Sequence, residues 1–179
     1  FTKGVKFEQK ADRSPVTVAD HEAESILLAA LARVAPDIPV VAEERISAGA
    51  ACEYARQFFL VDALDGTRLF IRGRPEFSIN IALVEDGKVR FGLIFLPPSE
   101  RLFATRADGA AYEARLHLSI REQSPGVEFA RISTRAPDPG ALVAFNSRGS
   151  GSASTNLLKT LNVMDARPLG SSMKFCLIA

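Results

Sequence analysis

Apolar side chains recur at helical spacing after Asp20, and this is the clearest pattern in the chain. The apolar positions are Ala23, Ile26, Leu27, Ala30, Leu31 and Val34. Their i, i+3, i+4 spacing predicts an amphipathic helix over residues 20–34. Thr17 or Asp20 can cap the start of this helix, and Pro36 ends it. Because the helix dipole favours a carboxylate at a helix start, Asp20 could be a cap and nothing more.

Two short, continuous apolar runs at residues 39–42 and 58–61 predict strands. The second run shows no polar alternation, which is typical of a strand buried on both faces of a sheet. Further along, two pairs of apolar segments flank Asp-Gly dipeptides, the strongest hairpin signal in the sequence. These segments predict a largely antiparallel sheet, and they are residues 77–84 and 89–95 across Asp86-Gly87, and 102–105 and 110–112 across Asp108-Gly109.

Both early apolar runs end in acidic residues. Glu43 and Glu44 follow the first run, and Asp62 and Asp65 follow the second. Since the strand ends of one sheet lie near each other, Glu43, Asp62 and Asp65 could converge on one point. Clustered carboxylates repel each other unless a cation lies between them, and Mg²⁺ prefers oxygen ligands of this kind. Two alternatives stay open: acids at a strand end are commonly solvated, and Asp65-Gly66 could simply reverse the chain.

A Pro-, Gly- and charge-rich stretch at residues 122–140 indicates a boundary between two units. We expect an N-terminal metal-binding α+β unit over 1–125 and the start of a C-terminal α/β substrate-binding unit over 126–179. In the second unit, residues 142–145 predict a strand and residues 155–161 a short helix. A later Gly-Ser-Ser segment enters an apolar stretch, where free backbone N–H groups and hydroxyls would make a generic anion site. A plain turn with an N-cap explains the same segment.

Composition narrows the class of protein. The chain has 179 residues, of which 47% are apolar and 24% charged, as in soluble globular proteins. The formal net charge is +1 without a basic block, which excludes a nucleic-acid footprint. No apolar run approaches the roughly 20 residues of a membrane span. Cys52 and Cys176 lack a metal-type spacing and are expected to be reduced thiols in a cytoplasmic protein.

Five motifs in this order carry a resemblance to a known family. They are VTVAD (16–20), VVAEE (40–44), LVDALDGT (60–67), EFSINIAL (76–83) and GSSMKFCLIA (170–179). Together they resemble the inositol monophosphatase-like, Mg²⁺-dependent, lithium-sensitive phosphatases, and most of all their CysQ-type 3'(2'),5'-bisphosphate nucleotidase branch. The resemblance covers residues 10–179. It implies an α+β, layered α/β/α/β/α sugar-phosphatase-like fold of the inositol monophosphatase and fructose-1,6-bisphosphatase type, which we expect to be incomplete at both ends.

The resemblance also implies a metal site for two or three Mg²⁺ ions. Its ligands would be Glu43, Asp62, the backbone carbonyl of Leu64, and Asp65, with Asp62 bridging two ions. Glu44 would belong to the catalytic site next to these ligands without binding the metal itself.

Catalytic and substrate-binding roles follow from the same resemblance. Asp20 and Thr67 would orient or deprotonate the attacking water, and Gly66 and Thr67 would offer N–H groups to the phosphate. Lys10 would help to steer phosphate. From the second unit, the substrate contacts would be Gly170, Ser171, Ser172 and Lys174.

The sequence departs from the family pattern in three places. Ala63 stands where proline is usual, which should loosen the turn slightly. The segment NSRGSGS (146–152) lacks the histidine that often follows Ser-Arg-Ser. The chain contains no tryptophan, so the downstream Trp-Asp motif with its further metal-ligating Asp has no counterpart among these residues. We therefore expect the natural protein to continue past Ala179.

The function implied is metal-assisted hydrolysis of the 3'-phosphate of adenosine 3',5'-bisphosphate to AMP and phosphate. Inositol monophosphatase or fructose-1,6-bisphosphatase activity is an alternative, and a non-catalytic metal- or phosphate-binding protein is another. The expected partner is a small phosphate substrate, without nucleic acid or an integral membrane segment. The sequence leaves open whether the protein forms a homodimer. It also leaves open whether the protein is purely cytoplasmic or lies peripherally at the inner membrane.

Overall fold

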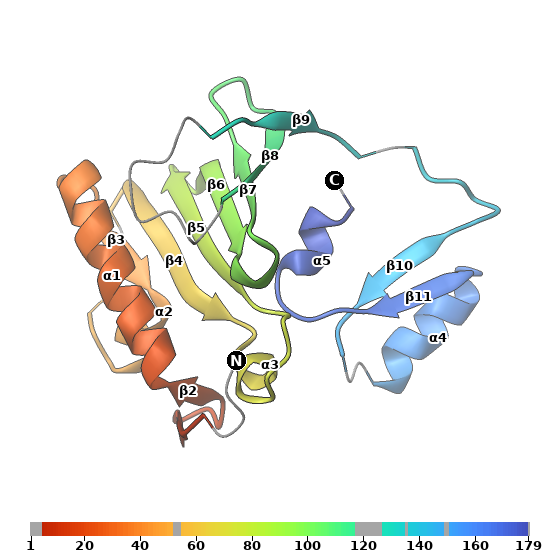
Figure 1. The fold of residues 1–179 in the computed structure, drawn as a ribbon, viewed down its shortest axis with the longest axis horizontal. Helices are drawn as coiled ribbons and strands as arrows, with labels where there is room; N and C mark the ends of the chain where they lie inside the picture. Colours follow the sequence, from red (N-terminus) through yellow and green to blue (C-terminus); the bar gives the residue numbers. More distant parts are fainter. Residues whose placement is uncertain (1–4, 52–54, 117–126, 135, 149–150, 179) are drawn as a thin grey trace.

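A seven-stranded sheet forms the centre of the computed structural model, which describes residues 5–51, 55–116, 127–134, 136–148 and 151–178 (Figure 1). Neighbouring strands are antiparallel except for β3 and β4, which run parallel, so the predicted sheet type is confirmed. In spatial order the strands are β3 (Val40–Ala42), β4 (Gln57–Asp65), β5 (Ser78–Glu85), β6 (Lys88–Leu96), β7 (Arg101–Thr105), β8 (Ala111–Arg115) and β9 (Ala130–Ile132). Together with its helices the sheet makes an α+β fold, as expected.

The two predicted hairpins are confirmed, and their turns explain why. Asp86 and Gly87 both have positive φ, 52° and 71°, which is the backbone of a turn whose twist matches antiparallel strands. Gly109 has a φ of 75° in the hairpin between β7 and β8. A one-turn 3-10 helix, η1 (Pro97–Ser99), connects β6 to β7, where the two prolines end the strand.

Helix α1 (Val18–Val34) covers one face of the sheet. Its Leu31 packs with Ala42, Phe59 and Val61 in a buried cluster that joins the helix to β3 and β4. Burying each large aliphatic side chain contributes about 1.5–3 kcal/mol, so this contact fixes the start of the chain against the acidic strand ends. Thr17 caps the helix, whose last residue precedes Ala35 and the predicted terminator Pro36.

The prediction that residues 58–61 are buried on both faces is wrong. Phe59 and Val61 lie under α1, but Leu60 on the opposite face is 49% exposed. On that face, α5 (Met173–Cys176) covers β6 and β7 through Cys176, which contacts Leu96 in a second buried cluster, and it leaves the β4 region open. Strand β4 also continues beyond its apolar part to Asp65.

Small elements flank the central sheet on both sides. The charged N-terminal segment forms the hairpin of β1 (Phe7–Gln9) and β2 (Pro15–Thr17). Toward the C-terminus, β10 (Val143–Asn146) and β11 (Asp165–Pro168) pair in parallel around α4 (Ser152–Thr160), close to the predicted strand and helix.

The large sheet extends past the boundary expected at 125/126, because β9 pairs with β8. Cys176 is a free, buried thiol, whereas Cys52 lies outside the described residues. In the described part of the chain, no helix combines the length and apolar character that crossing a membrane requires.

Candidate active site

Asp62 and Asp65 lie in the last part of β4, at the end of the sheet that we call the acidic edge. The register with β5 is interrupted between these two residues by an irregularity, and the backbone N–H of Leu64 donates to Oδ1 of Asp62 at 3.1 Å. Gly66 has a φ of 101°, and a Cβ on it would lie 2.7 Å from the carbonyl oxygen of Glu76. This position therefore requires glycine twice over, for its backbone angle and for its space.

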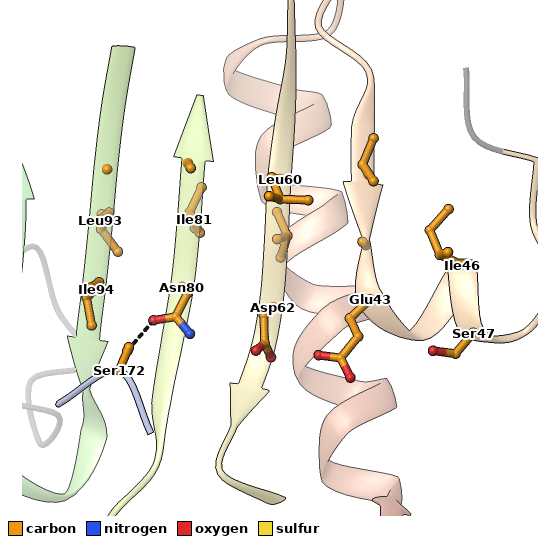
Figure 2. A pocket seen from close by; sticks show the side chains of 15 residues that line it. Glu43, Ile46, Ser47, Leu60, Asp62, Asn80, Ile81, Leu93, Ile94 and Ser172 are labelled. Carbon is orange, nitrogen blue, oxygen red and sulfur yellow. Dashed lines mark hydrogen bonds between the residues drawn. The ribbon is translucent and has the colours of Figure 1, made fainter. Parts of the chain in front are cut away.

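Glu43 reaches the same edge from the neighbouring parallel strand. Ala42 pairs with Val61, so Glu43 and Asp62 each follow one member of that pair. Figure 2 shows their carboxylates side by side below the apolar face around Leu60. These residues line a cavity of about 590 Å³ whose walls are mostly aliphatic.

The crowding of acids at this edge changes how Asp62 titrates. Burial raises the pKa of Asp62 to about 7, and the negative charges of Glu43 and Asp65 add to the effect. Without a cation, one carboxylate of the group therefore holds a proton near neutral pH. A positive ion beside Asp62 would relieve both the burial cost and the repulsion.

Lys10 supplies positive charge to part of this group. Its ammonium lies 2.7 Å from a carboxylate oxygen of Glu43 and 2.7 Å from one of Glu44. Burial works against the charge of Lys10, but the two hydrogen bonds outweigh it and raise the pKa of the ammonium. Burial also raises the pKa of the Glu44 carboxyl, despite its contact with Lys10.

Helix α2 (Glu43–Ser47) begins at the two glutamates and holds them in place. Glu24 of α1 accepts hydrogen bonds from the backbone N–H groups of Glu44 at 2.8 Å and Arg45 at 3.1 Å. A buried carboxylate thus caps the start of α2 from another helix. The sequence interpretation missed Glu24, since its position inside α1 carries no local signal of a cap twenty residues away.

Asp20 and Thr67 meet although they are distant in sequence. The Thr67 hydroxyl donates to Oδ1 of Asp20 at 2.9 Å and also lies 3.1 Å from the carbonyl oxygen of Leu64. The other oxygen of Asp20 accepts from the backbone N–H of Thr17 at 2.8 Å and from its hydroxyl at 2.5 Å. Asp20 therefore belongs to the capping box of α1 and also binds Thr67, so capping is not its only role.

The Gly170–Ser172 segment approaches the acidic edge from the far end of the chain. The N–H of Ser172 donates to Oδ2 of Asp65 at 2.5 Å, and its hydroxyl donates to Oδ1 of Asn80 at 2.6 Å. The N–H of Gly170 donates to Glu76 at 2.8 Å. The expectation that this segment offers free backbone N–H groups is therefore wrong at Gly170 and Ser172, because carboxylates of the first unit occupy both donors.

An ion pair between exposed Arg148 and buried Glu76 holds this arrangement together. Arg148 lies 2.7 Å from Oε2 of Glu76, the oxygen that also accepts from Gly170. Its guanidinium keeps the pKa of the Glu76 carboxyl below its ordinary value. Polar residues at alternate positions of EFSINIAL, namely Glu76, Ser78 and Asn80, were the available sequence signal for this network.

The expected convergence of three metal ligands is incomplete. Within the described ranges, no three Asp, Glu, His or Cys side chains are gathered so that they could hold a metal ion. Glu43 and Asp62 are neighbours, but Oδ2 of Asp65 is engaged by Ser172 and by Ser78 at 3.3 Å. Glu43 and Asp62 also have protein donors of their own, the ammonium of Lys10 and the backbone N–H of Leu64. The oxygen donors and the raised pKa of Asp62 nevertheless fit a hard divalent ion.

A second, polar cavity of about 810 Å³ adjoins the acidic edge. It is lined by Asp65, Gly66 and Thr67 on one side and by Gly170, Ser171 and Ser172 on the other. Lys174 also lines it, with its ammonium donating to the carbonyl oxygen of Ser171 at 2.6 Å. Residues from both ends of the chain thus enclose a space of the size that small ligands occupy.

Comparison with known proteins agrees with this geometry. The model of the inositol monophosphatase family matches residues 1–179. The chain is 34% identical over 177 residues to the 3'(2'),5'-bisphosphate nucleotidase CysQ of Salmonella typhimurium, covering 99% of this chain and 67% of that protein. It is 35% identical over 106 residues to the fructose-1,6-bisphosphatase/inositol-1-monophosphatase of Thermotoga maritima, covering 58% of this chain and 40% of that protein.

A solved structure shows the same fold. CysQ from Bacteroides thetaiotaomicron, described as a bacterial member of the inositol monophosphatase family, superposes with a TM-score of 0.72 at 27% identity. The match covers 94% of this chain and 65% of that one. The chain therefore spans about two thirds of the length of the nucleotidases it resembles.

Proposed function

The chain belongs to the inositol monophosphatase family, and from this premise we propose that its protein hydrolyses phosphate monoesters, with adenosine 3',5'-bisphosphate as the preferred substrate. The reaction would release the 3'-phosphate and leave AMP. The observation that carries the proposal is the hydrogen bond between Thr67 and Asp20 beside the acidic edge, because it prepares a base for water next to carboxylates that could hold a metal.

The metal site would be formed by Glu43, Asp62, Asp65 and the carbonyl of Leu64, and Mg²⁺ is the ion that suits these oxygen donors. When bound, divalent ions lower the pKa of coordinated water and neutralise charge on the transferring phosphoryl group. Glu44 and Lys10 would keep Glu43 oriented through their shared contacts. Two or three ions is our expectation for the complete protein.

Thr67 and Asp20 would then act on water. With its hydrogen donated to Asp20, the hydroxyl oxygen of Thr67 has lone pairs free to accept a hydrogen bond from a water molecule. That contact orients the water, and a proton leaving it can pass through Thr67 to the buried carboxylate of Asp20. At the start of α3 (Thr67–Ile71), the backbone N–H groups of Gly66 and Thr67 would bind phosphate oxygens.

The second unit would close over the substrate. Ser171, Ser172 and Lys174 line the polar cavity opposite α3, and Gly170 holds the segment to Glu76. Hydroxyl groups and the ammonium of Lys174 are suitable donors to a sugar or phosphate. Because Ser172 already binds Asp65 and Asn80, substrate contact here also keeps the two ends of the site aligned.

A related substrate is the second candidate. The Thermotoga maritima relative is named for fructose-1,6-bisphosphatase and inositol-1-monophosphatase, and its match extends over 58% of this chain. The nucleotidase match extends over 99% and includes the second unit, which would contact the part of the substrate away from the metal. This difference favours the nucleotide.

Phosphate release from the full-length protein tests the proposal. Adenosine 3',5'-bisphosphate, inositol 1-phosphate and fructose 1,6-bisphosphate would be compared with Mg²⁺, and with and without lithium. We expect the nucleotide to give the highest kcat/KM and lithium to inhibit. Hydrolysis of inositol 1-phosphate but not of the nucleotide would show that the nucleotide is not the preferred substrate. Tight Mg²⁺ binding without release from any of the three would show a non-catalytic protein.

A further inference from the structure

The polar cavity is lined by one arginine of α3 and by a second that directly follows this helix. Arg68 and Arg72 are exposed, line the cavity, and form no hydrogen bond or ion pair with another described residue. They are four positions apart, so they lie on one side of this single helical turn. The other cavity cations differ from them: Arg148 is paired with Glu76, and Lys174 donates to Ser171.

The packing of α3 directs these arginines toward the substrate-facing segment. Leu69, between them, lies so close to Gly170 that a Cβ on the glycine would be 1.9 Å from its Cδ1 atom. The backbone of the second unit therefore rests directly on α3, which follows the end of β4 (Figure 1). Arg68 and Arg72 line the same cavity as Thr67 and Ser171.

Charge separates the two parts of this cavity. Toward Glu43 and Asp65 it is acidic and suits a cation, whereas toward α3 it carries two unpaired guanidinium groups. A guanidinium binds a phosphate through two parallel hydrogen bonds, more specifically than an ammonium does. The arginine side therefore suits an anion that is not the one held at the acidic edge.

We propose that Arg68 and Arg72 form a second anion subsite, which binds the phosphate group that is not hydrolysed. This inference rests on the proposed function for the identity of the reacting group. It names the substrate class as a compound that carries two phosphates, one at the acidic edge and one at α3. A nucleoside monophosphate with the scissile phosphate alone leaves both arginines unoccupied.

The experiment compares two substrates in the full-length protein. kcat/KM would be measured for adenosine 3',5'-bisphosphate and for adenosine 3'-monophosphate in wild type, Arg68→Gln, Arg72→Gln and the double variant. Each substitution is expected to lower kcat/KM for the bisphosphate about tenfold, the equivalent of one charge-assisted hydrogen-bonded contact. For the monophosphate, the change should stay within about twofold. Arg33→Gln is the matched control, since it removes an exposed arginine of α1 outside the cavity.

A binding measurement separates this inference from the proposed function. AMP carries the second phosphate without the scissile one, and its affinity can be measured by calorimetry without turnover. The double variant should weaken AMP binding by the same factor as it lowers kcat/KM for the bisphosphate. Equal losses of kcat/KM for the bisphosphate and for adenosine 3'-monophosphate would overturn the subsite. So would an unchanged AMP affinity in the double variant, or no AMP binding by wild type. Loss of AMP binding in a protein that releases no phosphate would keep the subsite and reject the proposed function.

Discussion

Thr67 donates its hydroxyl hydrogen to Asp20 across 47 positions of sequence, at 2.9 Å. The contact joins the first helix to the turn after β4, and it brings a buried carboxylate to the edge where Glu43 and Asp62 lie. Asp20 keeps its capping bonds to Thr17 with its other oxygen. One residue thus completes the capping box at the start of a helix, as its N3 position, and also binds the hydroxyl of Thr67.

Removing this hydroxyl should impair turnover far more than folding. Thr67→Val keeps the shape of the side chain but leaves one oxygen of Asp20 without its donor, which costs about 1–3 kcal/mol of stability. We expect kcat to fall by about 10²–10⁴, the usual contribution of a positioned proton acceptor. KM should change little. Thr67→Ser restores the hydroxyl and should recover most of kcat, and a failure of this rescue would contradict the assignment.

Sequence patterns predicted the regular parts of this fold for clear reasons. Periodicity located α1, and two Asp-Gly turns fixed both hairpins, because these signals act within a few residues. The exposure of Leu60 could not be predicted, since it depends on how far α5, which lies much later in the chain, reaches over the sheet. Local pattern carries no such information.

The candidate site was also predictable from the sequence only in part. The motifs singled out Asp20, Glu43, Asp62 and Thr67, and the structure brings them to one edge of the sheet. The sequence did not show which hydrogen-bond donors and cations would bind the acidic side chains. Lys10, Ser172 and Arg148 neutralise or bind the acids, and these contacts join segments that are distant along the chain.

The contribution of Asp62 to the stability of the metal-free protein should fall as the pH rises from about 4 to about 7. The pKa of Asp62 is raised from 3.8 to about 7 in the folded chain. The folded state therefore binds a proton at pH values where the unfolded chain has released it, so this residue favours folding less as the pH increases. Asp62→Asn cannot ionise, and its Tm at pH 8 without metal should exceed that of wild type by roughly 3–6 °C.

Thermal unfolding followed by circular dichroism at pH 4, 6 and 8 checks this expectation. The difference between Asp62→Asn and wild type should disappear near pH 4. With Mg²⁺ added at pH 8, wild type should gain stability and the variant should not. Asp37→Asn, an exposed residue after α1, serves as the charge-matched control. A constant difference at all three pH values would show that charge at Asp62 is not the cause.

Lys10 should compete with a metal for Glu43. Its ammonium contacts both glutamates at 2.7 Å, and its side chain is only 11% exposed. Lys10→Met keeps the aliphatic stem and removes the charge, so the metal-free protein should lose about 1–3 kcal/mol, while Mg²⁺ should restore more stability than it gives wild type. The measurement is Tm against Mg²⁺ concentration. Equal Mg²⁺ responses in the two proteins would mean that Glu43 does not contribute to the metal site.

The contact between Gly170 and Leu69 should control how the Gly170–Ser172 segment lies against the polar cavity. A methyl group at Gly170 would overlap Cδ1 of Leu69 and press on Glu76 at 3.3 Å. Since Leu69 is the flexible partner, Gly170→Ala should fold with a loss of about 1–3 kcal/mol and shift the Gly170–Ser172 segment away from Asp65. KM for the phosphate substrate should rise about three- to tenfold, with a smaller change in kcat.

A second substitution separates overpacking from loss of backbone freedom. Gly170 does not have a positive φ, so alanine at this position is strained by space rather than by backbone angle. Leu69→Ala removes the obstructing atoms, and the Leu69→Ala/Gly170→Ala pair should be more stable than the sum of the two single losses by about 1 kcal/mol or more, with KM returning toward the wild-type value. Strictly additive losses would mean that the segment does not rest on α3, and they would remove the packing that places Arg68 and Arg72 beside it.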